Sequence, residues 1–131
     1  MDIVVTFPGG KRTEAVSGGH TVITDQPVSN GGEDSAPSPF NLFLVSIASC
    51  AAIYVIFFCQ KRDIPLDDIR VVQSTERDPD TRAVTRVSID VELPADFPEK
   101  YKSALLKAID LCTVKKTIQN PPEFDLRAVT R

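Results

Sequence analysis

Short β-branched runs alternate with paired glycines at the start of the chain. The runs cover residues 3–7, 13–16 and 21–24, with Gly9-Gly10 and Gly18-Gly19 between them. Paired glycines supply the positive φ that tight hairpin turns require. The pattern therefore predicts a three-stranded antiparallel meander. A segment rich in Pro, Gly, Ser and Asn follows over residues 26–39 and indicates a loop between structural layers.

An uncharged apolar stretch of 18 residues, LFLVSIASCAAIYVIFFC, then covers positions 42–59. Ser38-Pro39 predicts the start of a helix, because proline is tolerated in the first turn. Lys61-Arg62 place positive charge at the expected C-terminal end, where it is favourable, and Pro65 prevents continuation. The sequence predicts one long helix that ends near Gln60.

This helix could be a membrane span or a helix buried within the protein, because its length is at the lower limit for crossing a bilayer. Its middle, Ser46 and residues 48–52, is small and partly polar, which suits close packing against protein. A lone membrane span would also divide the N-terminal meander from the later strands. A helix buried within the protein is the better interpretation, and a helix that is apolar all round needs protein on every side. One chain of this size offers too little cover, so we expect an obligate homodimer.

Alternation with a period of two returns after the helix. Residues 69–77 and 82–93 predict a hairpin around Asp78-Pro79-Asp80-Thr81. Val87, Ile89, Val91 and Leu93 fall on one face of the second strand, as in a sheet with one covered and one solvated face.

A second helix is expected next. Asp96 and Glu99 match a D-x-x-E capping box, and apolar residues recur at helical spacing from Tyr101 to Cys112. Asn120-Pro121-Pro122 then breaks the chain before a last short strand predicted over residues 124–128. The expected order βββ-α-ββ-α-β is α+β, with antiparallel sheets around a long buried helix.

Composition limits the class of protein. With 131 residues and 42% apolar residues, the chain suits a single domain over 1–131. The net charge of −3, with scattered Lys and Arg, favours neither nucleic acid nor a membrane surface. No signal sequence is recognisable at the N-terminus. Three cysteines is an odd count, which points to a reducing cytoplasm, and the single His20 argues against a metal site.

The cysteines carry the candidate chemistry. A cysteine within an apolar helix, such as Cys50, is by default a small buried hydrophobe whose pKa is raised by desolvation. Cys112 precedes residues 113–119, and if these form a helix its dipole would stabilise a thiolate there by about 0.3–1 kcal/mol. Cys59 lies nine residues after Cys50, about 13.5 Å along a helix, which exceeds disulfide reach. We therefore expect Cys59 to serve core packing.

Several motifs resemble the OsmC and organic hydroperoxide resistance family. Residues 36–42, APSPFNL, and 48–52, ASCAA, resemble the segment that introduces the family's first cysteine. Residues 111–114, LCTV, are similar to its second cysteine site, and the Gly-Gly-His-Thr-Val stretch before Asp25 resembles the OsmC-like branch. The element order agrees over nearly the whole chain.

The resemblance implies an intertwined homodimer and a thiol peroxidase cycle without metal or organic cofactor. Cys50 would attack the O–O bond of an organic hydroperoxide, Cys112 would form a disulfide with it, and an external dithiol would reduce that bond. An arginine and a glutamate accompany the reactive cysteine in this family, and Arg12 is the closest match by position, with Lys11 next. The pocket residues implied by the site are Phe40, Asn41, Phe43, Ile47, Tyr54 and Phe57.

The chain departs from the family pattern at the acid. Phe40 and Asn41 stand at the positions, ten and nine residues before Cys50, where relatives carry a carboxylate. Glu33 and Asp34 in the preceding loop are the nearest replacements. The departure keeps a second hypothesis open, in which the protein has little peroxidase activity and binds a small apolar ligand at the dimer interface. His20, the one base available to a Cys-His hydrolase, is more simply a residue at a turn.

Overall fold

The computed structural model describes residues 1–131. The chain divides into two compact units, Met1–Val45 and Ser46–Arg131, and each is described by itself. The elements are mixed α and β, with antiparallel sheets and three α-helices. This arrangement confirms the α+β fold class expected from the sequence.

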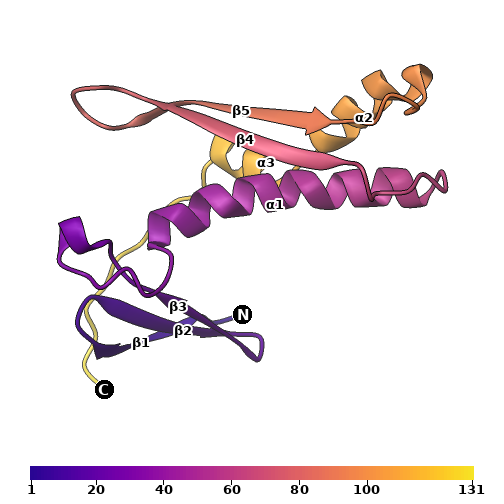
Figure 1. Ribbon diagram of the computed structural model, residues 1–131. Coiled ribbons are helices and arrows are strands. Elements are labelled where there is room, and N and C mark those ends of the chain that lie inside the picture. The colour runs from indigo at the N-terminus through magenta and orange to yellow at the C-terminus, as the bar shows by residue number, and fades with distance from the viewer. The chain divides into compact units, whose positions relative to one another are not determined.

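The first unit contains the predicted meander (Figure 1). Strands β1 (Val4–Gly9), β2 (Arg12–Ser17) and β3 (His20–Thr24) pair antiparallel in that order. Gly18 and Gly19 connect β2 to β3 with φ of 55° and 80°, a conformation that glycine adopts without strain. Ser17 pairs with His20 at this turn, so His20 lies at the strand edge, as predicted.

A buried aspartate organises the loop that follows β3. Asp25 is 1% exposed and accepts hydrogen bonds from the amides of Gln26, Glu33 and Ser35 and from the Ser35 hydroxyl. The bonds from the Ser35 hydroxyl and amide, with those from the other two amides, outweigh burial and lower the pKa of Asp25 to about 2. Gly32 lies so close that a Cβ there would be 2.0 Å from the Gln26 carbonyl oxygen. One carboxylate therefore holds both ends of the loop.

This network predicts a pH-dependent stability. Asp25→Ala should lower the Tm at pH 7 by roughly 5 °C, because buried amides lose their acceptor. Since the folded-state pKa is lowered, the wild-type advantage is fully present above the unfolded pKa of about 3.9 and is lost as pH falls through about 2. Thermal melts of both proteins between pH 7 and pH 2 measure the difference. Exposed Asp2→Ala serves as the control, and a Tm gap that stays constant down to pH 2 would contradict the assignment.

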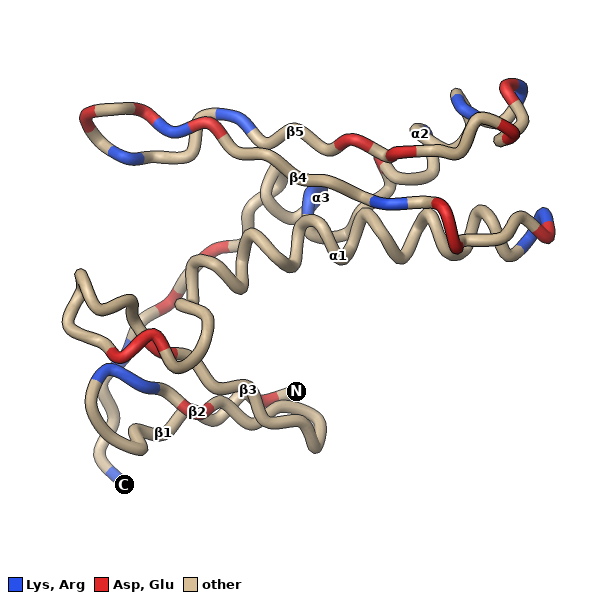
Figure 2. Tube along the Cα trace, in the orientation of Figure 1, with Lys and Arg blue, Asp and Glu red and all other residues tan.

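Helix α1 (Pro39–Gln60) starts and ends where the sequence predicts. The Ser38 hydroxyl accepts a hydrogen bond from the Asn41 amide, as an N-cap residue does. At the other end, the Arg62 guanidinium lies 3.6 Å from the centre of the Phe58 ring and donates to the Phe58 carbonyl. Figure 2 shows that α1 carries no charged residue along its length, with the charges gathered beyond its C-terminal end.

Only one face of α1 is covered within the chain. Its buried residues are Ile47, Ala51, Val55, Phe58 and Cys59. Large apolar side chains remain exposed on the other faces, among them Phe40, Phe43, Val45, Ile53 and Phe57. By length and composition α1 could cross a membrane, but a core helix of a soluble protein meets the same criteria.

The second unit packs a hairpin on α1 (Figure 1). Strands β4 (Arg70–Arg77) and β5 (Val84–Glu92) pair antiparallel, and the Asp78 carboxylate accepts from the amides of Asp80 and Thr81 in the turn. Val91 and Leu93 of the predicted apolar face contact a buried core that includes Val55, Phe58, Cys59, Phe97 and Leu105. The hairpin prediction is confirmed.

The C-terminal third corrects two predictions. A 3₁₀ turn, η2 (Glu99–Tyr101), leads into α2 (Lys102–Ile109), and no side chain caps either, so the Asp96/Glu99 capping box is wrong. Pro98 stands at the N-cap of η2, which brings the start closer to Glu99 than the motif requires. Residues 120–131 contain no strand, so the one predicted over 124–128 is also wrong. A strand needs a partner, and neither sheet includes this segment.

The helical spacing from Tyr101 to Cys112 conceals a break. Helix α2 ends at Ile109, and a separate helix, α3 (Thr113–Gln119), begins with Cys112 as its N-cap residue. The amide of Cys112 donates to the Ile109 carbonyl at 3.0 Å, which turns the chain between the two helices. The short helix considered over residues 113–119 is thereby confirmed.

Candidate functional site

The fold brings Cys50 and Cys112 into direct contact. Cys50 lies in the middle of α1, and Cys112 comes from the turn between α2 and α3, 62 positions later in the chain. The Cys112 thiol donates a hydrogen bond to the Cys50 sulfur, and both cysteines are free. The two sulfurs are therefore neighbours in the reduced protein.

The N-terminus of α3 is directed at the Cys50 sulfur. The amides of Thr113 and Val114, in the first turn of α3, donate to it. These N–H groups have no acceptor within their own helix, so an anion is the favourable partner for them. The amide of Lys115 donates instead to the Cys112 sulfur at 3.5 Å. One helix terminus thus supplies donors to both sulfurs.

The two thiols are shifted in opposite directions. Burial opposes ionisation of Cys50, but the hydrogen bonds from the Cys112 thiol and from the amides of Val114 and Thr113 prevail and lower its pKa. Burial raises the pKa of Cys112, and the hydrogen bond that it donates to Cys50 adds to this, against the opposing bonds from the amides of Lys115 and Val114. Cys50 is therefore the thiol that ionises first.

This result corrects the sequence-based expectation for the helix terminus. The spacing placed Cys112 at the N-terminus of a short helix and predicted stabilisation of its thiolate. Cys112 does occupy the N-cap, but the Thr113 and Val114 amides favour the Cys50 thiolate, while Cys112 stays protonated. The contact between Cys50 and the α3 amides joins residues far apart in sequence, so no local sequence pattern predicts it.

The third cysteine, Cys59, lies in a different environment from Cys50 and Cys112. It is fully buried in the apolar core, and burial raises its pKa despite the charge of Arg62. Its packing role is confirmed. Cys50 is partly exposed, whereas Cys112 is 2% exposed. Among the three thiols, Cys50 alone combines access with a lowered pKa.

Tyr54 lies one turn after Cys50 and faces the same helix terminus. Its hydroxyl is 3.5 Å from the Thr113 hydroxyl, and its ring meets that of Phe57 edge to face with centroids 6.0 Å apart. Phe57 is half exposed. Both side chains therefore belong to the surroundings of the Cys50–α3 contact.

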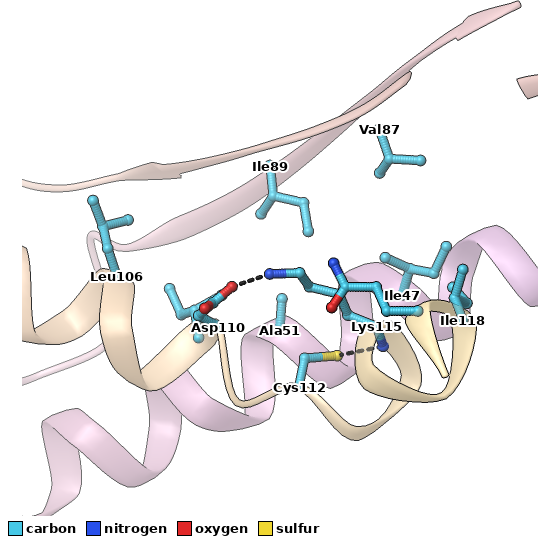
Figure 3. A pocket seen from close by; sticks show the side chains of 11 residues that line it. Ile47, Ala51, Val87, Ile89, Leu106, Asp110, Cys112, Lys115 and Ile118 are labelled. Carbon is cyan, nitrogen blue, oxygen red and sulfur yellow. Dashed lines mark hydrogen bonds and ion pairs between the residues drawn. The ribbon is translucent and has the colours of Figure 1, made fainter. Parts of the chain in front are cut away.

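A pocket of about 370 Å³ adjoins the Cys112 side of this contact (Figure 3). Helix α1, strand β5 and helices α2 and α3 each contribute to its wall. The lining residues are Ile47, Ala51, Val87, Ile89, Leu106, Ile109, Asp110, Cys112, Lys115, Ile118 and Gln119. The two charged members, Asp110 and Lys115, form an ion pair with each other, so the remaining wall is largely apolar.

Of the pocket residues expected from the sequence, Ile47 lines this pocket. Phe40, Asn41, Phe43, Tyr54 and Phe57 do not line it. The residues that the sequence analysis missed come mainly from α2 and α3. Val87 and Ile89 were predictable, because the alternation in β5 had already placed them on the covered face.

The remaining candidates lie in the N-terminal unit. The Arg12 guanidinium is 3.7 Å from the Glu33 carboxylate, and both side chains reach solvent. The rings of Phe40 and Phe43 pack with centroids 5.6 Å apart in the first turns of α1. Glu33 is thus the carboxylate that accompanies Arg12 in this unit. No group of three or more His, Cys, Asp or Glu side chains is arranged to hold a metal ion.

Residues 32–127 match the sequence model of OsmC-like proteins. The matched region is more than two thirds of the chain. The chain belongs to the OsmC-like family. None of the curated proteins matches it. Both cysteines of the candidate site in this OsmC-like chain, Cys50 in α1 and Cys112 at the N-cap of α3, fall within the matched region.

Solved structures agree with this assignment. An osmotic stress induced and detoxification response protein of Psychrobacter arcticus is 26% identical, with a TM-score of 0.73 over 88% of this chain and 85% of that one. An OsmC like protein of Mycoplasma pneumoniae is 14% identical, with a TM-score of 0.70 over 92% and 87%. An organic hydroperoxide resistance protein OsmC of Legionella pneumophila is 20% identical, with a TM-score of 0.53 over 91% and 90%. The last two support the OsmC-like fold.

Proposed function

We propose that this OsmC-like protein is a thiol peroxidase that reduces organic hydroperoxides through Cys50 and Cys112. The observation that carries the proposal is the opposite shift of two touching thiols. The α3 amides lower the pKa of Cys50, while burial raises that of Cys112. A low-pKa thiol beside a protonated one is what an attacking and a resolving cysteine require. One OsmC-like relative is named for organic hydroperoxide resistance.

The proposed cycle begins with the Cys50 thiolate and ends with reduction by an external dithiol. The Cys50 thiolate attacks the terminal oxygen of the hydroperoxide, the O–O bond breaks, and the alkoxide takes a proton to leave as alcohol. Cys50 is now a sulfenic acid. The Cys112 sulfur attacks the Cys50 sulfur, its proton leaves with the hydroxide as water, and a disulfide forms. An external dithiol then returns both cysteines to thiols and becomes a disulfide itself.

Arg12 is the cation of the proposed site. The family resemblance implies an arginine with a carboxylate beside it, and Glu33 supplies that carboxylate in place of the acids absent at Phe40 and Asn41. An arginine held in this way can present N–H donors to a peroxide oxygen that gains negative charge as the O–O bond breaks. Lys11 is the neighbouring alternative.

The proposal includes a soluble cytoplasmic homodimer without metal or cofactor. The large apolar side chains exposed on α1 and on strands β1–β3, such as Phe7, Ile23, Phe43 and Phe57, support it, because monomers rarely expose so many. A reducing compartment fits three free cysteines and a cycle that ends in reduction by thiols.

Exposing the reduced protein to one equivalent of cumene hydroperoxide tests the proposal. We expect the loss of two of the three thiols, no added oxygen, and a disulfide that peptide mass spectrometry assigns to Cys50 and Cys112. Cys59 should remain a thiol, because its burial disfavours the thiolate.

The pocket beside Cys112 supports the competing hypothesis of an apolar-ligand binding protein. The binding hypothesis predicts that all three thiols remain free after exposure to cumene hydroperoxide. Three free thiols after prolonged exposure would overturn the peroxidase proposal and leave the binding function. A disulfide involving Cys59 would overturn the proposed pairing.

A further inference from the structure

The loop after β3 contains an Asn-Gly pair, Asn30-Gly31, and both residues are exposed. A backbone amide nitrogen can attack the side chain of a preceding asparagine and displace ammonia from it. Glycine permits this attack best, because it has no Cβ to shield its nitrogen and few limits on its backbone angles. Asn30 therefore has the neighbour with which an asparagine loses its side-chain amide most readily.

The other two asparagines of the chain lack such a neighbour. Asn120 precedes Pro121, whose nitrogen carries no hydrogen and cannot attack in this way. Asn41 precedes Leu42, whose amide donates a hydrogen bond of 3.0 Å at the start of α1. Both serve as internal references for the reactivity of Asn30.

The closed loop keeps the reacting groups of Asn30 and Gly31 apart. Asn30 ends a 3₁₀ turn, η1 (Val28–Asn30), and the Gly31 amide donates to the Val28 carbonyl at 3.1 Å. The Asn30 side-chain amide donates to the Gln26 side-chain oxygen at 3.0 Å. Ring closure needs the Gly31 nitrogen beside the Cγ of Asn30, which requires a ψ angle far from that of a 3₁₀ turn. Both hydrogen bonds must therefore break before the groups can react.

We propose that Asn30 is a site of spontaneous deamidation, and that the hydrogen bonds of Asp25 protect it by holding the loop closed. When the loop opens, the Gly31 nitrogen bonds to the Cγ of Asn30 and the bond from Cγ to the side-chain nitrogen breaks. The Gly31 proton leaves with that nitrogen as ammonia. Water then opens the cyclic imide at either carbonyl, which gives aspartate or isoaspartate. The reaction needs only water, so it does not depend on the proposed peroxidase function.

Asp25 controls how often the loop opens. Its carboxylate accepts amide hydrogen bonds from residues on both sides of Asn30, namely Gln26, Glu33 and Ser35. A reaction that needs local opening proceeds at a rate set by the population of the open form. The same bonds fix the backbone of Glu33, the carboxylate beside Arg12, so opening also releases that ion pair from its support.

Isoaspartate would make the opening permanent. It places the Cβ of residue 30 in the main chain, so the backbone between Pro27 and Gly32 becomes one atom longer. Gly32 has no space for a displaced chain, since even a Cβ there would be 2.0 Å from the Gln26 carbonyl oxygen. Its amide also donates to the Pro27 carbonyl at 3.1 Å. The lengthened loop therefore cannot return to the closed arrangement.

The rate of deamidation at physiological temperature and pH, followed by peptide mass spectrometry, tests the role of Asp25. Asp25→Ala should convert Asn30 roughly tenfold faster than the wild type, because the open form gains population when these bonds are lost. Ser35→Ala removes only the hydroxyl bond to Asp25 and should give an intermediate rate. Asp2→Ala should react like the wild type. Equal rates in all four proteins would overturn the inference, and Ser35→Ala decides if Asp25→Ala does not fold.

Two further rates separate loop opening from unfolding of the whole protein. Val55→Ala destabilises the core of the other unit without touching the loop, and its Asn30 should react at the wild-type rate. Equal acceleration in Val55→Ala and Asp25→Ala would assign the reaction to global unfolding and overturn the inference. Wild-type Asn30 that reacts as fast in the folded protein as in urea would overturn the protection.

Thermal melts of the product test whether opening becomes permanent. The isoaspartate form is separated chromatographically and compared with Asn30→Asp, which has the same charge and a backbone of ordinary length. We expect the isoaspartate form to melt roughly 5 °C lower, because the Asp25 bonds cannot form again. Equal Tm values would overturn the irreversible opening of the loop.

Discussion

Replacing Cys50 by serine should lower kcat/KM for organic hydroperoxides by about a thousandfold or more. A serine hydroxyl is not ionised near neutral pH, so the donors on α3 would have no anion to stabilise. Coupled consumption of reductant with cumene hydroperoxide measures the loss. Activity that survives in this variant would remove Cys50 from the mechanism.

Two controls separate chemistry from folding. Cys59→Ala removes the buried thiol of the same helix and should retain the activity, because Cys59 contacts the core and not the Cys50–Cys112 pair. Sedimentation equilibrium of the wild type and of Cys50→Ser should give the same dimer mass. A monomeric Cys50→Ser protein would attribute its lost activity to assembly, and a monomeric wild type would refute the dimer.

Local sequence patterns were enough to predict most of the elements. Glycine pairs located the meander turns, the period of two located the β4–β5 hairpin, and Ser38-Pro39 located the start of α1. Each of these signals acts within a few residues of the feature it produces. The predicted strand over 124–128 failed for the opposite reason, because a strand depends on a partner that local sequence does not specify.

The candidate site was predictable only in part. The motifs around Cys50 and Cys112 named both cysteines, but the directions of their pKa shifts depend on a contact between α1 and α3. A local rule assigned the donors of α3 to Cys112, the residue that precedes them in sequence. In the folded chain the Thr113 and Val114 amides also serve Cys50, which reverses the order in which the thiols ionise.

Thr113→Pro tests this contact by removing one donor. Proline is favoured at the first position of a helix, and Cys112 before it has φ −47° and ψ 120°, which suits a residue that precedes proline. The variant should therefore keep α3 while losing the Thr113 N–H bond to the Cys50 sulfur. We expect the pKa of Cys50 to rise and its reaction at neutral pH to slow by roughly tenfold, since hydrogen bonds to charged groups are among the stronger ones.

The pH dependence of alkylation by iodoacetamide, read on the Cys50 peptide, measures this effect. The midpoint of the rate profile should lie at higher pH in Thr113→Pro than in the wild type, because the thiolate has lost a donor. Thr113→Ala is the matched control: it removes the hydroxyl near Tyr54 but keeps the amide, and its midpoint should stay with the wild type. An unchanged midpoint in Thr113→Pro would show that the Thr113 amide does not activate Cys50. An equal shift in both variants would assign the effect to the Thr113 hydroxyl.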